Sequence, residues 1–394
     1  MATILLTWEL GGGLGHLMNL RPLMEELPKR GHRVIAALRD LSSAHEMLGG
    51  ANVEYLQAPF KHQKMRLIEP TCTFAQVLHN CGFSAVEELA TLAGAWRTMF
   101  KCVKPDLIVC DHSPMALLAA RGLPARRAVI GAGFTAPPDE SPLTNLRTSI
   151  EPDLAQLQAH EDEVLENSNA VLRRWGEPTI DRVARLYNPV DEMFLLTFPE
   201  LDCYPHRRGA TYWGKWAVEM GQSPEWPAGK GPRIFGYLKP FPALPQLLTT
   251  LHGLPNPMLV YASGVDDALK NRFRSPNLHF ADGPINLVKA ARECDVAILN
   301  GTHGSAATML LAGKPALHIP IFLEQGINAA AVAKLGAGIN AMPNEPGEIA
   351  AGLHALLNLS QFGNAAHAFA ARYADFDSAR QVAKLVDRAE QLAA

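Results

Sequence analysis

The chain of 394 residues is longer than one hydrophobic core normally spans, so its length predicts two domains. Its composition, with 48% hydrophobic and 19% charged residues, is that of an ordinary globular protein. The net charge of −3, without a long run of one sign, argues against a general nucleic-acid-binding protein, which would carry a basic face.

The cysteines and the apolar runs bear on the compartment. The six cysteines form no Cys-x-x-Cys pair and no metal-ligand spacing, which favours reduced thiols and a cytoplasmic location. The amino terminus has no basic region and only a short apolar run, so no signal peptide is expected. No apolar run approaches the ~20 residues that span a bilayer, whereas peripheral membrane contact stays compatible with the sequence.

The first elements form a strand–loop–helix–strand unit. A short apolar run at 2–8 predicts a buried strand, and the glycine-rich stretch 9–16 predicts a loop. The spaced apolar residues of 17–31 predict a helix ending at Gly31, and a second strand follows over 32–38. Such a unit is normally right-handed.

The same rhythm continues through both halves of the chain. A polar helical stretch covers about 151–186, and the end, about 362–392, predicts helix with a break near 373–378. The stretch 204–232, rich in Gly, Pro and Trp, has the character of a linker. Further strands are expected at 105–111, 126–134, 193–201, 233–238, 258–264, 277–281, 295–300 and 316–321.

This pattern predicts an α/β protein with two Rossmann-like, doubly wound parallel sheets. We expect one domain over 1–215, a second over 216–375 and a final helix over 376–394. Ligands of such folds bind in the crevice at the carboxyl ends of the strands. A ligand held in a central cleft between two facing crevices is therefore expected.

A polar, small-residue turn follows the strand expected at 295–300. Four of its residues let the backbone approach a ligand closely: Gly301, Gly304, Ser305 and Ala306. The helix after the turn offers N–H groups and a partial positive charge that suit a phosphate. His303, placed just before the turn, and Thr308 can add donors, although both also fit ordinary turn and helix positions. Glu324 and Gln325 are expected at the next strand end, where a carboxylate and an amide suit sugar hydroxyls.

The stretch 302–330 resembles the donor-binding motif of GT-B glycosyltransferases, most closely the bacterial natural-product and UDP-glycosyltransferase type. The matching residues are His303, Gly304, Ser305, Thr308, Gly313, Pro315, Gln325 and Asn328. The resemblance implies that the histidine and the Ser/Thr residues bind the diphosphate of a nucleotide sugar. It also implies that the acidic-Gln pair binds the donor sugar, and that the last helix crosses back to the first domain.

Departures from the family pattern leave the nucleotide, UDP or TDP, open. Ala307 stands where Gly or Asn is usual, and Glu324 where Asp is commoner. Leu311 stands where plant members place a glutamate on the ribose. The segment 280–298 resembles the family's base-binding segment, which implies that Ile285 holds the base through its backbone, but the usual tryptophan is absent.

The stretch 11–34 resembles the family's first loop and helix, Gly-x-Gly-His followed by a helix ending in Gly-His. His16 is expected at the start of that helix, with Gly13 beside the donor diphosphate. Asp111 ends a predicted strand at the same sheet edge. A neutral histidine can take the acceptor's proton as the new bond forms, typically worth about 10²–10⁴-fold. A carboxylate on its other nitrogen fixes the tautomer and stabilises the imidazolium.

These side chains also have plain structural interpretations. His16 suits a cap or the core, Asp111 suits a helix cap, and the adjacent His112 is expected to be structural. Trp8, at the end of the first strand, is a candidate acceptor contact. The aromatic residues of 60–100 fit the core better than an acceptor pocket.

The resemblance implies an inverting glycosyltransferase that uses His16, oriented by Asp111, to activate an acceptor hydroxyl or other nucleophile, with no metal and no further cofactor. The partners expected are a nucleotide sugar and a small-molecule, lipid or glycan acceptor, without nucleic acid; a protein acceptor and the oligomeric state stay open. A nucleotide-sugar 2-epimerase on the same scaffold and a non-catalytic nucleotide-sugar-binding subunit are the alternatives. Dinucleotide binding is disfavoured, because His16 occupies the third glycine position of G-x-G-x-x-G.

Overall fold

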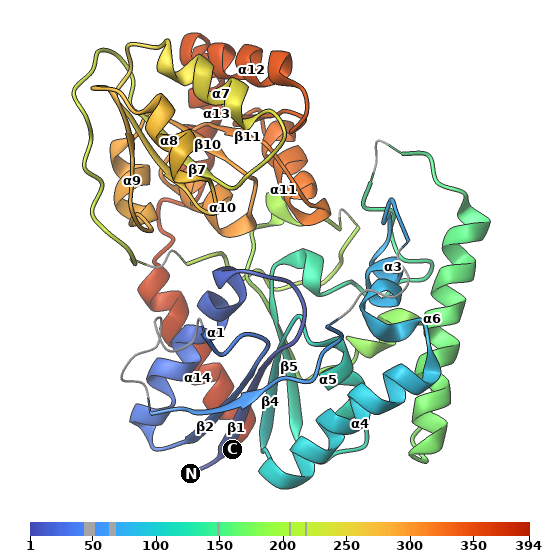
Figure 1. The fold of residues 1–394 in the computed structure, drawn as a ribbon. Coiled ribbons are helices and arrows are strands. Elements are labelled where there is room, and N and C mark those ends of the chain that lie inside the picture. The colour runs from blue at the N-terminus through green and yellow to red at the C-terminus, as the bar shows by residue number, and fades with distance from the viewer. Residues whose placement is uncertain (43–51, 63–67, 148–149, 205, 217–218) are drawn as a thin grey trace. The chain divides into compact units, whose positions relative to one another are not determined.

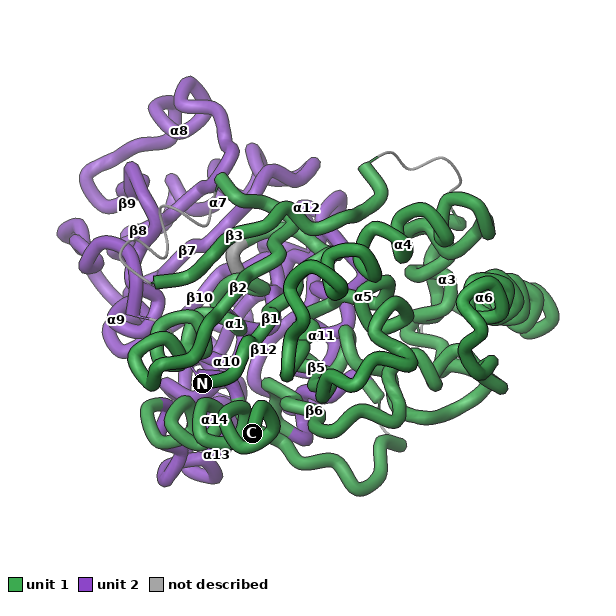
Figure 2. The backbone as a smooth tube through the Cα atoms, turned by 90° about the horizontal axis from the view of Figure 1, so that it is seen from below, with its two compact units in different colours: residues 1–198, 204–214, 379–394 green, residues 199–203, 215–378 purple. Residues whose placement is uncertain are grey.

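The structure is a computed structural model that describes residues 1–42, 52–62, 68–147, 150–204, 206–216 and 219–394 (Figure 1). The chain divides into two compact units (Figure 2). Unit 1 comprises Met1–Phe198, Tyr204–Gly214 and Ala379–Ala394. Unit 2 comprises Pro199–Cys203 and Lys215–Ser378. The last helix therefore belongs to the same unit as the amino terminus.

Unit 1 is built on a six-stranded sheet in the order β3-β2-β1-β4-β5-β6, and every pair of neighbouring strands is parallel. Trp8 pairs with both Leu38 and Asp111, so the last residues of the two central strands lie side by side at the carboxyl edge. The strands are β1 (Thr3–Trp8), β2 (Arg33–Leu38), β3 (Glu54–Gln57), β4 (Leu107–Asp111), β5 (Arg126–Gly131) and β6 (Glu192–Leu195).

Helices cover the unit 1 sheet, and short turns of 3-10 or π-helix lie in the connections between its elements. The α-helices are α1 (Leu14–Glu26), α3 (Phe74–Leu78), α4 (Val86–Val103), α5 (Pro114–Ala119), α6 (Leu154–Arg174) and α14 (Ser378–Ala393). The short turns are η1 (Pro28–Arg30), η2 (His79–Phe83), η3 (Gly133–Thr135) and η4 (Val183–Leu186).

Two features of these helices differ from the sequence-based expectation. The helix expected over 151–186 is shorter, because Gly176 adopts a left-handed φ of 71° just after the C-cap residue Trp175 and ends α6. The region 60–100, to which no element was assigned, contains α3 and α4. Its aromatic residues lie mainly in the core, as expected: Phe74, Phe83, Trp96 and Phe100 are buried, and Phe60 is half-buried.

The carboxyl-terminal helix α14 packs on unit 1 beside the end of α1 (Figure 1). Its buried face carries Leu385, Val386 and Ala389, all without exposed surface. Ion pairs surround this face and join Arg30 to Asp387 and Glu390, His32 to Glu390, and Arg388 to Glu192. Because exposed ion pairs contribute only about 0–1 kcal/mol each, the apolar face supplies most of the docking energy.

Unit 2 repeats the sheet topology of unit 1. Its strand order is β12-β11-β10-β7-β8-β9, and all neighbouring pairs are parallel. If β7 is counted as the first strand of the unit, the order read from β9 is 3-2-1-4-5-6, which is the order in unit 1. The prediction of two doubly wound parallel sheets is confirmed. The strands are β7 (Ile234–Leu238), β8 (Met258–Ala262), β9 (Leu278–Phe280), β10 (Val296–Leu299), β11 (Ala316–His318) and β12 (Gly338–Asn340).

Alternate residues of the unit 2 strands face opposite helical layers. Ile234 and Ile298 belong to the apolar cluster that includes residues of α7 and α12, whereas Phe235 and Leu299 belong to the cluster with residues of α9 and α10. The helices are η5 (Pro199–Leu201), α7 (Leu244–His252), α8 (Asp267–Phe273), α9 (Leu287–Glu293), α10 (His303–Leu311), α11 (Leu323–Lys334), α12 (Pro346–Asn358) and α13 (Ser360–Arg372).

Two observations concern the whole described chain. All six cysteines are free thiols. Within the described ranges, no helix combines the length and the apolar character that crossing a bilayer requires.

Candidate active site

His16 and Asp111 meet at the carboxyl edge of the unit 1 sheet. His16 lies in the first turn of α1, and Asp111 is the last residue of β4. The Nδ1 atom of His16 is 2.9 Å from Oδ1 of Asp111, and Asn19 donates an amide N–H to Oδ2 at 2.8 Å. Asp111 is fully buried, and both of its oxygens accept a hydrogen bond. Because a carboxylate can only accept, it holds the Nδ1 proton on His16 and leaves Nε2 as the basic nitrogen.

The ring of His16 is held between an aromatic ring and a glycine backbone. Trp8 stacks on it with a centroid distance of 5.5 Å and an interplanar angle of 19°. Trp8 is 2% exposed and donates its indole N–H to the Leu10 carbonyl at 2.8 Å. Gly11 has a φ of 80°, and a Cβ there would overlap Nε2 of His16. Gly13 lies nearby as the exposed residue before α1.

His112 follows Asp111 in an unusual conformation. Its φ is 45°, in the left-handed region of backbone conformation that residues other than glycine rarely adopt. Its ring is buried, and the centroids of the His112 and His16 rings are 5.6 Å apart. Among the described residues, neither ring nitrogen of His112 has a hydrogen-bond partner. Burial, followed by the charges of His16 and Arg39, lowers the pKa of His112 well below its usual value. The imidazole is therefore neutral at physiological pH.

Glu9 is a buried carboxyl group that the sequence analysis missed. It follows β1 and has no exposed surface. Its two oxygens accept the backbone N–H groups of Met115 and Ala116, at 3.1 and 3.2 Å, at the start of α5. Burial raises the pKa of Glu9 to about 8, and the two N–H groups oppose that rise only in part.

In unit 2, a glycine turn leads from β10 into α10. Gly301 has a φ of 79°, and a Cβ there would lie 2.8 Å from the carbonyl oxygen of Gln325, so the position requires glycine. His303 is the first residue of α10 and not, as expected, a residue before the turn. The turn thus brings the amino terminus of α10 to the carboxyl edge of the unit 2 sheet.

The hydroxyl groups of this helix bond to its own backbone. Ser305 donates to the Thr302 carbonyl at 3.0 Å, and Thr308 donates to the Gly304 carbonyl at 2.8 Å. Ala306 is buried behind them. The helix therefore presents its first N–H groups as anion donors, whereas the hydroxyl hydrogens are used within the helix in this conformation.

A lysine that the sequence analysis missed lies beside the start of α10. The Cε atom of Lys215 would lie 3.6 Å from a Cβ placed on Gly304. Burial, and secondly the charge of Lys215, lowers the pKa of His303 to about 3. A neutral, buried His303 can donate a ring N–H, while Lys215 brings a positive charge to the same helix end.

Glu324 and Gln325 lie on a helix and not, as expected, at a strand end. The strand β11 stops at His318, and Pro320, which has no N–H, cannot extend the ladder. Both residues occupy the first turn of α11, where Gln325 is buried. Its Oε1 accepts the N–H groups of Ile321 and Phe322 at 2.8 and 3.3 Å, so the amide oxygen caps the helix.

Ile285 lies in a backbone bridge just before α9. Gln222 donates its N–H to Pro284 O and accepts the Asn286 N–H, each at 2.8 Å. In this parallel bridge the N–H and C=O groups of Ile285 itself take no part. They point away from Gln222 and form a donor–acceptor pair of the kind that a pyrimidine base can match.

No model of a known protein family matches the sequence, and no curated protein matches it. Among solved structures, the chain is similar to CalG4, the calicheamicin glycosyltransferase, with a TM-score of 0.73, 16% identity and coverage of 99% of this chain and 98% of that one. The spinosyn rhamnosyltransferase SpnG has a TM-score of 0.69 and 18% identity, with coverage of 99% of this chain and 100% of that one. The glycosyltransferase VinC has a TM-score of 0.68 and 15% identity, with the same two coverages. The chain has the GT-B fold of these glycosyltransferases.

Within this GT-B fold, the two groups of candidate residues belong to different units. His16, Asp111, Trp8 and Gly13 lie in unit 1, whereas Ile285, the turn 301–308 and the pair Glu324–Gln325 lie in unit 2. Within the described ranges, no three His, Cys, Asp or Glu residues gather in a way that could hold a metal ion. The unit 1 group can accept a proton, and the unit 2 group can bind an anion.

Proposed function

We propose that the protein is an inverting glycosyltransferase, which moves a sugar from a nucleotide-diphosphate sugar to an acceptor hydroxyl in a single displacement. The observation that carries the proposal is the hydrogen bond between His16 and the buried Asp111, in a chain with the GT-B fold. Unit 1 receives the acceptor, and unit 2 binds the donor.

His16 acts as the general base. Its Nε2 takes the hydroxyl proton while the acceptor oxygen forms a bond to the anomeric carbon and the bond from that carbon to the diphosphate oxygen breaks. The nucleoside diphosphate leaves from the opposite face, which inverts the anomeric configuration. Asp111 accepts the hydrogen bond from Nδ1 and stabilises the imidazolium that forms.

The start of α10 receives the donor diphosphate. The N–H group of Ser305, the neutral ring of His303 and the charge of Lys215 all favour an anion there. The N–H group of Ala306 donates to the Thr302 carbonyl at 3.0 Å, so it can bind the diphosphate only after that bond breaks. Because these groups stabilise the leaving diphosphate, the reaction needs no metal ion. Gly13 of unit 1 contributes its N–H. Thr308 contributes its hydroxyl only after its bond to the Gly304 carbonyl breaks.

The nucleoside and the sugar bind at neighbouring positions in unit 2. Ile285 pairs with the base through its backbone, and Glu324 with the Nε2 group of Gln325 binds sugar hydroxyls. Leu311, at the end of α10, cannot hydrogen-bond to a ribose hydroxyl, which favours a deoxyribose and hence a thymidine diphosphate sugar. The structural neighbour VinC was solved with dTDP.

The acceptor is a hydroxyl-bearing small molecule that reaches the basic nitrogen of His16. Trp8 borders this position through its stacking on the His16 ring. The structural neighbour SpnG was solved with the spinosyn aglycone, which supports an aglycone as the acceptor class.

A nucleotide panel followed by product analysis tests the proposal. We expect dTDP, and more weakly UDP, to raise the melting temperature, with little effect of ADP or GDP. With a thymidine diphosphate sugar and hydroxylated aglycones, NMR of the product should show the anomeric configuration opposite to that of the donor. A new nucleotide sugar formed without acceptor would instead identify a 2-epimerase. Binding without any turnover across the acceptor panel would support the non-catalytic subunit.

A further inference from the structure

The turn after Asp111 has a strained backbone that needs support. His112, with its φ of 45°, connects Asp111 to the start of α5. A side-chain residue in the left-handed region costs of order 1–3 kcal/mol, and it persists only where the surrounding structure fixes it. The conformation of this turn sets the direction of the Asp111 side chain, because the two residues are adjacent.

The residues that follow β1 fix this turn from the neighbouring strand. Leu10 donates its N–H to the His112 carbonyl at 3.0 Å. Glu9 accepts the N–H groups of Met115 and Ala116, three and four residues beyond His112. One short segment therefore holds the turn on both sides of its strained residue.

The carboxyl group of Glu9 accepts these two hydrogen bonds without an ion-pair partner among the described residues. Arg39 donates to the Glu9 backbone carbonyl, at 3.1 Å, and not to the carboxyl group. The other titratable groups whose charges interact with it are the buried Cys110 and Tyr187. Burying a carboxyl group is unfavourable unless hydrogen bonds compensate it, and here the two N–H groups of α5 do so in part.

We propose that Glu9 is a positioning residue: by holding the start of α5, and with it the turn at His112, it keeps Asp111 at hydrogen-bond distance from His16. This inference rests on the proposed glycosyl transfer, in which His16 is the base. Glu9 itself touches neither substrate, so its effect passes through Asp111.

Glu9→Gln tests the inference because both oxygens of a carboxyl group can accept an N–H group, even when the group is protonated, whereas the NH₂ group of an amide cannot accept. One bond is lost, the turn loosens, and Asp111 stabilises the imidazolium of His16 less well. We expect kcat to fall about 10-fold. We also expect the acidic limb of the pH–rate profile to move to lower pH, and KM for the nucleotide sugar to stay unchanged. Glu9→Asp keeps two acceptor oxygens and should recover part of the activity; if the amide variant does not fold, a smaller shift of the same sign in Glu9→Asp is the expected result.

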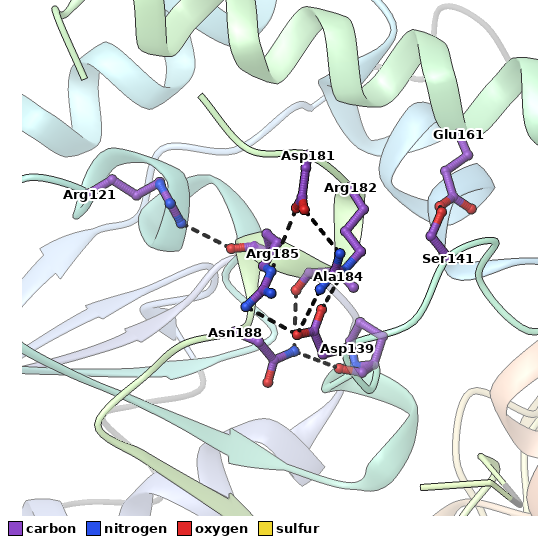
Figure 3. Close-up of polar contacts among 10 residues, drawn as sticks. Arg121, Asp139, Ser141, Glu161, Asp181, Arg182, Ala184, Arg185 and Asn188 are labelled. Atoms are coloured by element: carbon purple, nitrogen blue, oxygen red, sulfur yellow. Dashed lines mark hydrogen bonds and ion pairs between the residues drawn. The ribbon is translucent and has the colours of Figure 1, made fainter. Parts of the chain in front are cut away.

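A double-mutant cycle separates positioning from general destabilisation. If Glu9 acts through Asp111, Glu9→Gln should reduce kcat less than about 2-fold further in an Asp111→Asn background. Losses that multiply would overturn the inference. Glu161→Gln is the matched control (Figure 3): Glu161 is also buried, burial also raises its pKa, and it accepts bonds from Ser141 Oγ at 3.1 Å and Leu143 N at 2.8 Å. It should lower the melting temperature and leave kcat and its pH profile unchanged.

The outcomes also separate this inference from the proposed function. A wild-type protein that transfers no sugar contradicts the proposed function. Transfer that Asp111→Asn abolishes, but that Glu9→Gln leaves at the wild-type rate and pH profile, contradicts only the role of Glu9. An equal shift of the pH profile in Glu161→Gln would also contradict that role.

Discussion

The two units share one strand order but carry different chemistry at the carboxyl edges of their sheets. In unit 1 the edge contains two buried carboxyl groups, Glu9 and Asp111, and the hydrogen bonds of Asp111 to His16 and Asn19 join side chains. In unit 2 the corresponding edge consists of a glycine turn, helix N–H groups and a neutral histidine. The shared strand order places both groups of residues at the carboxyl edge of a sheet, and the residues that follow each strand determine whether the edge can transfer a proton or bind an anion. Proton transfer is therefore assigned to unit 1 and anion binding to unit 2.

The largest expected effect comes from Asp111→Asn in unit 1. The amide cannot hold the Nδ1 proton of His16 as a carboxylate does, so we expect kcat to fall about 10²–10⁴-fold. The rise in melting temperature caused by dTDP should stay at its wild-type value, because unit 2 binds the nucleotide. Steady-state kinetics and thermal unfolding check this division, and a loss of dTDP binding in this variant would break it.

Gly301→Ala should produce the opposite pattern in unit 2. The new Cβ would lie 2.8 Å from the Gln325 carbonyl at a φ of 79°, so the turn must shift, and we expect a destabilisation of about 1–3 kcal/mol. The affinity for dTDP should fall about 10-fold, as measured by calorimetry. The control is Gly326→Ala in α11, where a Cβ meets no atom within 4 Å and stability should not fall. Equal effects of the two substitutions would contradict a special role for the turn.

Lys215→Gln should have a smaller effect, restricted to the diphosphate. Removing the charge beside Gly304 should lower the affinity for dTDP about 5-fold and leave the affinity for thymidine unchanged. The salt dependence of dTDP affinity should also decrease. Lys289, which donates to Ser223 Oγ at 3.0 Å, provides the control Lys289→Gln. If thymidine and dTDP lose affinity equally, Lys215 does not contact the diphosphate.

The pH dependence of the free energy of unfolding tests the protonation state of Glu9 independently of enzyme activity. Because burial raises the Glu9 pKa from 4.5 to about 8, the folded state keeps a proton that the unfolded state releases between these values. The contribution of Glu9 to stability is therefore complete below pH 4.5 and is lost as pH rises through about 8, with a slope of up to about 1.4 kcal/mol per pH unit. Urea unfolding at pH 5.5 and 8 should show a smaller decrease for Glu9→Gln than for wild type. An identical decrease would mean that Glu9 is ionised throughout.

The sequence allowed much of this comparison to be predicted. Long apolar runs identified the central strands of both sheets, and the glycine-rich loops that follow them located His16 and His303. The strands that escaped prediction, β3 and β12, are short edge strands with exposed or polar residues, which carry little periodic signal. The position of Glu324 and Gln325 was wrong because an apolar run continues past Pro320, where the ladder has already ended.

Contacts between distant segments could not be predicted. Glu9 meets the start of α5 from 106 residues away in sequence, and Lys215 reaches Gly304 from a stretch that resembles a linker. Neither local periodicity nor a motif encodes such a pairing. Asn19 could have been found, because a position three residues after His16 lies on the same helix face and points to the same carboxylate.

The most direct test of the account is His16→Ala, assayed in parallel for nucleotide binding and for sugar transfer. We predict that dTDP raises the melting temperature of the variant as much as that of wild type, while single-turnover transfer to the acceptor falls by at least about 10²-fold. Loss of both properties would mean that His16 belongs to the donor site or supports the fold. Retention of both would contradict its role as the base.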